Sequence, residues 1–322
     1  MALNPEKKTV FNCFVKNGIQ KLDDFKHSGK EVEYLSLKVE NITHFQEFIK
    51  TFPNVKKLEI ATKDMEGEIP KEVKFKKLKS AIFLNPIKKN LWSIFSNLEE
   101  ISFGTKGHIE LFTSEFINGI IELNKNTLTK LDLIHVAVAK NSYEPLRIPC
   151  QLKELNLHFC FDSLLDEICR KEKDRMLEDS SQINKRFFIR KNQIVTFQNA
   201  KDVIESQKNL NHLTIERIVI DEDFLNSISQ SGARSLKLID TALRFDAIKD
   251  QAKEFFNRLK KVDLSRLPNK PGLRVILSHL QDVEILDIHF IFNCKMNPLE
   301  ERNVLSKLRP SECITIIWLL KS

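Results

Sequence analysis

The sequence LTKLDL at Leu128–Leu133 and the sequence LKELNL at Leu152–Leu157 are two copies of one pattern. In each copy an apolar residue is followed by two others, an apolar residue, one other and a third apolar residue. The fourth and sixth positions are two residues apart, so in an extended strand both side chains point to the same face. Each copy is therefore predicted to be a short strand that buries leucines on one side. A strand this small needs neighbours to cover its apolar face.

Further copies of the pattern recur along the chain at a nearly constant spacing. Val32, Val55 and Leu78 begin copies 23 residues apart, and Leu259 and Val283 begin copies 24 residues apart. Other copies begin at Leu98 and Leu210, weaker ones at Leu78 and Ala233, a plausible last one at Cys313, and a degenerate one ends at Phe197. A period of this length is typical of leucine-rich repeats, which recur every ~20–29 residues.

Between the copies the apolar period changes from 2 to 3.6, which predicts helices. In ITHFQEFIKTF, Phe45, Phe48 and Ile49 fall on one helical face, and FDAIKDQAKEFFNRL at 245–259 repeats the arrangement. DEDFLNSISQS at 221–231 carries acidic residues in its first turn, as a helix start favours. The predicted fold is an α/β leucine-rich-repeat solenoid, a horseshoe with parallel strands on the concave face and helices on the convex face.

The repeats from Val32 to Trp318 resemble the irregular arrays of F-box leucine-rich-repeat proteins, with LTKLDL and LKELNL as the nearest stretch. They resemble ribonuclease-inhibitor-like proteins more loosely. The F-box resemblance implies substrate recognition for an SCF-type ubiquitin ligase, with a Skp-type adaptor and a cullin as partners. Residues 1–31 depart from that family because they show no leucine-proline opening of an F-box. We expect 1–31 to be an N-terminal helical cap and 32–322 to be one repeat domain of about eleven or twelve repeats.

Composition places the chain among folded proteins of a reducing compartment. Hydrophobic residues make up 42% and charged residues 30%, which is ordinary for a globular protein. The six cysteines form no CxxC pair, and the first residues lack the apolar core of a signal peptide. A cytoplasmic or nuclear protein is therefore expected. The net charge of +7 is mildly basic and spread along the chain.

No sequence motif for catalysis or for cofactor binding is present. The chain has no GxGxxG, no GxxxxGK[ST], no GxSxG and no HExxH, and its eight histidines are scattered. His158 and His289 each lie after the last core position of a repeat, Leu157 and Ile288, and suggest a pair of metal ligands. Water-facing histidines at strand ends are the commoner case. We therefore predict a protein that is no enzyme and that uses no cofactor or metal.

A protein partner is predicted instead, bound by the strand residues that flank the core leucines. These side chains are polar, mixed in charge and able to form hydrogen bonds, which suits protein recognition as well as a merely solvated sheet face. They are Tyr34, Ser36, Glu59, Lys130, Asp132, Glu154, Asn156, His158, His212, Thr214, Asp263, Asp287 and His289.

Two basic segments offer an alternative, a nucleic-acid-associated protein. PKEVKFKKLKS at Pro70–Ser80 contains five lysines, as a phosphate-binding patch or as a solvated loop that leads into a strand. The second segment, 185–191, lies in a charged insertion at 166–193 that interrupts the repeats. There Phe187 and Phe188 either anchor a partner, with Lys185, Arg186, Arg190 and Lys191 as a basic rim, or pack inside a degenerate repeat.

Overall fold

The computed structural model describes residues 10–14, 29–39, 42–62, 69–70, 73–105, 111–139, 143–159, 194–195, 199–245, 248–267, 270–280, 283–291 and 313–319. The chain forms two compact units. Unit 1 comprises Met1–Cys150 and Asp162–Thr196, and unit 2 comprises Gln151–Phe161 and Phe197–Ser322. The repeats are thus divided between these two units, and one repeat domain over 32–322 stays a prediction.

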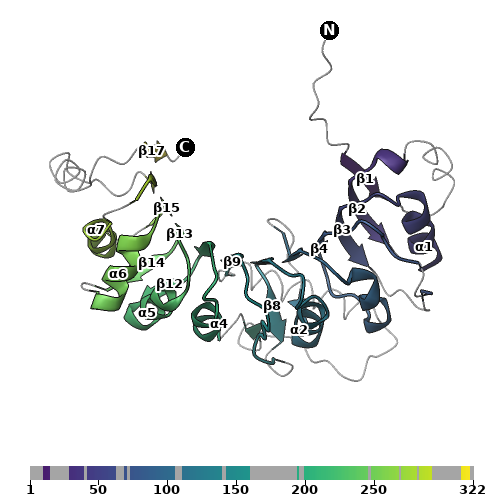
Figure 1. Cartoon of the computed structure of the whole chain (residues 1–322), viewed down its shortest axis with the longest axis horizontal. Helices are drawn as coiled ribbons and strands as arrows, with labels where there is room; N and C mark the ends of the chain where they lie inside the picture. Colours follow the sequence, from purple (N-terminus) through teal and green to yellow (C-terminus); the bar gives the residue numbers. More distant parts are fainter. Residues whose placement is uncertain are drawn as a thin grey trace, which may run out of the picture. The chain divides into compact units, whose positions relative to one another are not determined.

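Unit 1 contains a parallel sheet in which each strand pairs with the strand of the next repeat (Figure 1). Its strands are β1 (Val10–Phe14), β2 (Tyr34–Val39), β3 (Lys57–Thr62), β4 (Ser80–Phe83), β5 (Glu100–Phe103) and β7 (Lys130–Ile134). The pattern leucines align across the sheet: Leu35 pairs with Leu58, and Ile101 pairs with Leu131. Because equivalent positions face each other, the core residues form continuous buried rows.

Helices connect these strands, and the longer ones cover the apolar face of the sheet. They are η3 (Gly29–Glu31), α1 (Ile42–Thr51), η4 (Lys89–Phe95) and α2 (Ser114–Leu123). The α1 helix lies where the apolar period predicted it, and Phe45, Phe48 and Ile49 are its buried residues. Further along, Phe83, Phe103 and Phe116 pack ring against ring with centroids 5.3–5.7 Å apart. Phenylalanines thus fill much of the layer between helices and sheet in this unit.

The N-terminal prediction of a helical cap is wrong for residues 10–14, which form β1. This strand pairs in parallel with β2, with Phe11 opposite Leu35 and Cys13 opposite Leu37. Phe11 and Cys13 therefore take the fourth and sixth positions of a further repeat. The pattern was missed because its first position is Lys8, which is polar. The remaining residues up to 28 lie outside the described part of the chain.

A second, smaller sheet in unit 1 corrects the expectation of a degenerate repeat ending at Phe197. It consists of β6 (Leu111–Phe112), β8 (Ala137–Ala139) and β10 (Ile194–Val195). The β10 strand pairs with β8 in the antiparallel direction. The repeat strands within the described residues pair in parallel. Ile194 and Val195 therefore extend this small sheet and add no strand to the main one.

Unit 2 repeats the same architecture. Its parallel strands are β9 (Glu154–His158), β11 (His212–Glu216), β13 (Ser235–Ile239), β15 (Lys261–Ser265), β16 (Ile285–Ile291) and β17 (Cys313–Leu319). The connecting helices are α4 (Ala200–Ser206), α5 (Glu222–Gln230), α6 (Asp250–Arg258) and α7 (Lys270–Leu277). A two-stranded sheet, β12 (Val219–Asp221) with β14 (Ala242–Arg244), accompanies them.

The helix starts in unit 2 follow from the sequence only where a cap is present. Asp221 caps α5, because its Oδ1 accepts a hydrogen bond from the backbone N–H of Phe224 at 2.8 Å. The α6 helix begins at Asp250, five residues later than the start of the predicted stretch at Phe245. Phe245 and Ile248 are nevertheless buried. Phe245 and Ile248 therefore pack against the core although they precede the helix, and their helical spacing does not mark where the helix begins. Both units confirm the predicted α/β leucine-rich-repeat fold.

Candidate functional site

The candidate site is the sheet face opposite the core leucines, which we call the polar face. It is formed by the third, fifth and seventh residues of each repeat pattern, which alternate with the buried fourth and sixth residues. The strand residues that the sequence predicted to bind a partner, from Tyr34 to Asp287, all lie at these positions. Among the half-buried ones are Tyr34, Lys130, Asp132, Glu154, Asn156, His158, His212 and Asp287. The predicted alternation is confirmed, while a binding role for these residues remains a prediction.

In unit 1 the polar face carries a cluster around Glu59. The hydroxyl of Tyr34 donates a hydrogen bond to Glu59 Oε2 at 2.9 Å, and the Ser36 hydroxyl donates to Oε1 at 3.0 Å. The ammonium group of Lys57 lies 5.6 Å from the centre of the Tyr34 ring. Burial, followed by the hydrogen bond to Glu59 and its negative charge, raises the pKa of Tyr34 to about 12. The side chains of this cluster thus hold one another in place.

We expect the Tyr34 phenol to ionise at about pH 12 when absorbance at 295 nm is followed in a Tyr143→Phe background. Adding Glu59→Gln should lower that pKa, because it removes the negative charge next to the phenolate. The pKa in the folded chain exceeds the unfolded value of 10.0, so stability is lost as the pH rises from about 10 to about 12. An unchanged midpoint in the Glu59→Gln variant would contradict the contact.

In unit 2 a hydrogen-bonded network joins neighbouring strands across the polar face. Asp263 accepts hydrogen bonds from the Lys237 ammonium and, at 2.6 Å, from the Ser265 hydroxyl. His212 Nδ1 lies 2.8 Å from Ser235 Oγ, and its Nε2 lies 3.0 Å from Thr214 Oγ1. Asp263 and Thr214 are 8% and 4% exposed, so they are buried where the sequence predicted solvent-facing side chains. The neighbouring side chains that contact them account for this burial.

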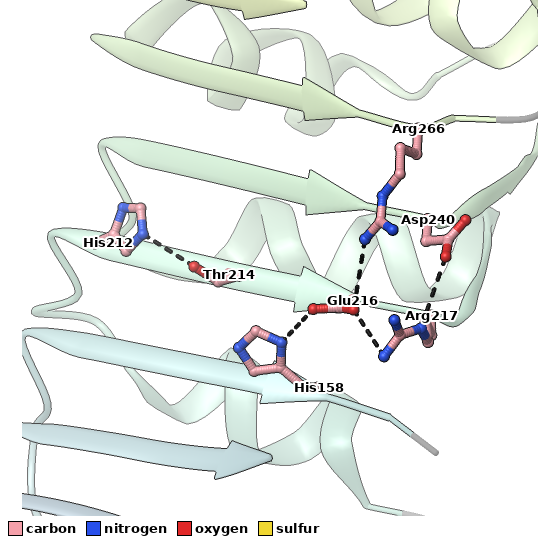
Figure 2. Close-up of polar contacts among 7 residues, drawn as sticks. All are labelled: His158, His212, Thr214, Glu216, Arg217, Asp240 and Arg266. Atoms are coloured by element: carbon pink, nitrogen blue, oxygen red, sulfur yellow. Dashed lines mark hydrogen bonds and ion pairs between the residues drawn. The ribbon is translucent and has the colours of Figure 1, made fainter. Parts of the chain in front are cut away.

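The strongest feature of unit 2 is a carboxylate buried at the end of the β11 strand (Figure 2). Glu216 is 1% exposed. Its Oε2 lies 2.5 Å from His158 Nδ1, and its Oε1 lies 2.8 Å from Arg217 Nη1 and 3.8 Å from Arg266 Nη2. Asp240 Oδ2 lies 3.7 Å from Arg217 Nε. A buried carboxylate is tolerated only with such partners, because removing it from water is costly.

Three members of this cluster share one backbone position. Arg217, Asp240 and Arg266 each follow the last residue of a strand and have φ values of 61°, 55° and 56°. This left-handed conformation is uncommon for residues other than glycine. It marks the point where the chain leaves each of these three strands, at the edge where Glu216 lies. The three residues occupy equivalent positions, so their side chains meet at that edge.

Sequence reasoning included His158 but missed Glu216, Arg217, Asp240 and Arg266. The signal is present in TIER, KLID and DLSR, where charged residues occupy the seventh or eighth position of successive repeats. An alignment of the repeats that extended past the sixth position would have shown it.

Several predicted residues lie outside what the structure describes. These are the insertion residues Lys185, Arg186, Phe187, Phe188, Arg190 and Lys191, together with the side chain of His289. His289 itself belongs to the β16 strand and pairs with Ser265 of β15. Within the described residues, no group of three or more His, Cys, Asp or Glu side chains is arranged to hold a metal ion.

The basic segment at 70–80 forms part of a repeat. Phe75 and Leu78 are buried, while Lys74, Lys76, Lys77 and Lys79 are exposed. Lys79 also forms an ion pair of 2.7 Å with Glu99 of the next repeat. The alternation shows that the apolar residues anchor this loop and that the lysines face solvent. None of the helices in the described ranges is long and apolar enough to span a bilayer.

Comparison with known proteins gives structural similarity only. No protein-family model and no curated protein sequence matches the chain. Similar solved structures include the TLR13–ssRNA13 complex, at 13% identity and a TM-score of 0.38 over 91% of this chain and 47% of that one. The Drosophila Toll–Spatzle complex is similar at 10% identity and a TM-score of 0.41, over 96% and 43%. Human 5T4, a Wnt-activated inhibitory factor, is similar at 11% identity and 0.27, over 80% and 79%.

The three structures are those of leucine-rich-repeat proteins. The chain spans less than half the length of the first two of them.

Proposed function

We propose that this chain is a protein-interaction module that binds a protein partner through the polar face. The observation that carries the proposal is the continuity of that face within each unit. In-register pairing places a polar side chain of each strand beside that of the next, as Asn156 lies beside Thr214 and then Lys237. The face is thus a broad array of hydrogen-bonding groups, of a kind that suits protein recognition.

The contacts among these side chains support recognition of a specific partner. Glu59, Asp263 and Glu216 are each held by neighbouring side chains, so their orientation is set before a partner arrives. A face that is already ordered loses less conformational entropy on binding. Its mixed charges favour a partner with the complementary arrangement and disfavour others. The proposal assigns the chain no catalytic step.

We expect charge reversal on the polar face to weaken capture of the partner strongly. The full-length tagged chain is used as bait in its native cells, and the captured proteins are identified by mass spectrometry. Lys130→Glu in unit 1 and Asp287→Lys in unit 2 should each reduce recovery of the partner by about tenfold or more, because like charges then face each other across the interface. Both side chains are half-buried on the polar face.

Matched controls carry the same charge changes on the helices. Lys50→Glu at the end of α1 and Glu254→Lys on α6 change exposed residues away from the polar face. We expect these controls to recover the partner as the unaltered chain does. Equal recovery by all four variants would exclude the polar face as the binding surface.

A finer proposal is substrate recognition for an SCF-type ubiquitin ligase in the cytoplasm or nucleus. It rests on the resemblance of LTKLDL and LKELNL to F-box leucine-rich-repeat proteins. The same capture experiment tests it, because a ligase component should bring a Skp-type adaptor and a cullin with the bait. Recovery of other proteins without an adaptor or a cullin would leave the binding module and reject the ligase role.

Nucleic acid is the alternative partner, and the exposure of Lys74, Lys76 and Lys77 favours it. Binding by phosphate contacts weakens steeply with salt, because counterions are released. If the lysines of Pro70–Ser80 carried the function, affinity for an RNA or DNA oligonucleotide should fall with added salt. It should also fall in a Lys74→Gln, Lys76→Gln, Lys77→Gln variant.

A further inference from the structure

Two arginines converge on one buried carboxylate oxygen at the edge of the polar face in unit 2. Arg217 Nη1 and Arg266 Nη2 lie 2.8 and 3.8 Å from Glu216 Oε1, while His158 Nδ1 lies 2.5 Å from Oε2. A single carboxylate therefore attracts two guanidinium groups from turns of two different repeats. Figure 2 shows Arg217 and Arg266 approaching Glu216 from different strand ends.

The negative charge in this cluster is unevenly shared. Asp240, the second carboxylate, follows β13, which lies between the strands that carry the two arginines, and its Oδ2 pairs with Arg217 Nε at 3.7 Å. Arg266 forms an ion pair with Glu216, but Arg217 lies closer to the same carboxylate oxygen, Oε1. Within the described residues, Arg266 forms no hydrogen bond, although a guanidinium has five donors. Its side chain is 37% exposed, so it is only partly covered by the rest of the chain.

The side chain of Arg266 is nevertheless directed by the fold. The strand order β11, β13, β15 places Glu216 and the end of β15 two strands apart, which is roughly 10 Å at the usual strand spacing. Arg266, whose backbone is left-handed with φ of 56°, therefore spans the end of β13 to form its ion pair with Glu216. The buried carboxylate of Glu216 thus positions the Arg266 guanidinium without accepting hydrogen bonds from its N–H groups.

We propose that Arg266, supported by Arg217, binds a carboxylate of the protein partner, supplied by an aspartate or glutamate side chain. This inference rests on the proposed function and names the chemistry of one contact. The fork of a guanidinium donates two parallel hydrogen bonds to a carboxylate, which fixes its orientation as well as its charge. Glu216 acts as the positioning residue, because it holds both arginines at the edge.

The test uses the full chain and a fluorescein-labelled octaglutamate peptide as the probe, followed by fluorescence anisotropy at low ionic strength. We expect Arg266→Gln to weaken binding about tenfold, the scale of one charge-assisted hydrogen-bonded pair. Arg266→Lys should also weaken it, because an ammonium lacks the fork. The matched control is Arg244→Gln, which removes an exposed arginine at the end of β14 in the same unit and should change affinity by less than about twofold.

Glu216→Gln separates a built site from diffuse attraction. This variant removes one negative charge from the edge, so simple attraction would bind octaglutamate more tightly. We expect weaker binding instead, because the arginines lose the group that directs them. Circular dichroism melting of each variant confirms that the chain is folded at the temperature of the measurement.

Unchanged affinity in Arg266→Gln, equal losses in Arg266→Gln and Arg244→Gln, or tighter binding in Glu216→Gln would each overturn the inference. A uridine octamer that binds more tightly than octaglutamate, with the same dependence on Arg266, would reject a carboxylate in favour of phosphate.

Failure of this inference can be told apart from failure of the proposed function. Loss of partner capture in the polar-face variants together with octaglutamate binding that ignores Arg266 leaves the module and rejects this site. If octaglutamate binding depends on Arg266 but the bait captures no protein, the carboxylate site stands and the proposed function is rejected.

Discussion

Replacing Asn124 with leucine is expected to lower the unfolding free energy of unit 1 by about 3–5 kcal/mol. Asn124 follows the α2 helix and is 1% exposed. Its Oδ1 accepts a hydrogen bond from Leu98 N at 2.7 Å, and its Nδ2 donates to Phe95 O and Ile120 O at 2.8 Å each. Leucine fills a similar volume but satisfies none of these buried backbone groups. The melting temperature of the first unfolding transition should fall by roughly 10 °C in scanning calorimetry.

Asn118→Leu is the matched control, because it removes an asparagine from the middle of the same helix. Its Nδ2 donates to Pro145 O at 3.0 Å, and its Oδ1 accepts from Arg147 N at 2.9 Å, in exposed surroundings. Water replaces such contacts, so we expect a loss of about 1 kcal/mol or less. A similar fall in both variants would show that the buried amide of Asn124 has no special role in joining the repeats.

Unit 2 uses the same device with a different residue. Gln207 follows the α4 helix, is fully buried, and accepts a hydrogen bond from Leu152 N at 2.8 Å through Oε1. In both units a side-chain amide after a helix binds the backbone just before a repeat strand. The residue types differ, and each amide lies far along the sequence from the N–H that it binds. A single sequence therefore offers no pattern from which this link between repeats could be predicted.

The strands of the main sheets were predictable because their spacing repeats. Leu264 of β15 lies opposite Ile288 of β16, as the 24-residue step between Leu259 and Val283 requires. Strands without the full pattern were not predictable. The β1 strand has a lysine in place of the first leucine, and β10 has only two residues. Each of these two strands forms through pairing with a neighbouring strand, β2 or β8. A local apolar period does not show which strands pair.

The candidate site was predictable only in outline. Alternation along a strand placed Asn156 and Asp287 on the polar face, but it gave no indication that Thr214 and Asp263 are buried there. That burial depends on neighbours such as Lys237, which comes from another strand. The Glu216 cluster draws on four strand ends from His158 to Arg266. Its members are brought together by the parallel stacking of repeats.

The second large effect is expected at Gly104, which ends the β5 strand with φ of 77°. A Cβ atom added at this position would lie 2.1 Å from the carbonyl oxygen of Ile134 in the neighbouring repeat. That oxygen belongs to the backbone at the end of β7, so it cannot move without disturbing the sheet. Gly104→Ala should therefore lower the unfolding free energy of unit 1 by about 4 kcal/mol, part of it from the left-handed backbone. Thermal and urea unfolding monitored by circular dichroism would measure the loss.

Gly104→Asn separates the two causes, because asparagine adopts the left-handed region more readily than alanine. If the contact with the Ile134 carbonyl dominates, both variants should lose most of the same stability, with asparagine better by up to about 1 kcal/mol. Near-normal stability in Gly104→Asn would mean that the backbone conformation alone requires glycine. The neighbouring repeat would then have room for a side chain at this turn. The corresponding turn after the β7 strand already carries a side chain there, that of His135, whose φ is 53°.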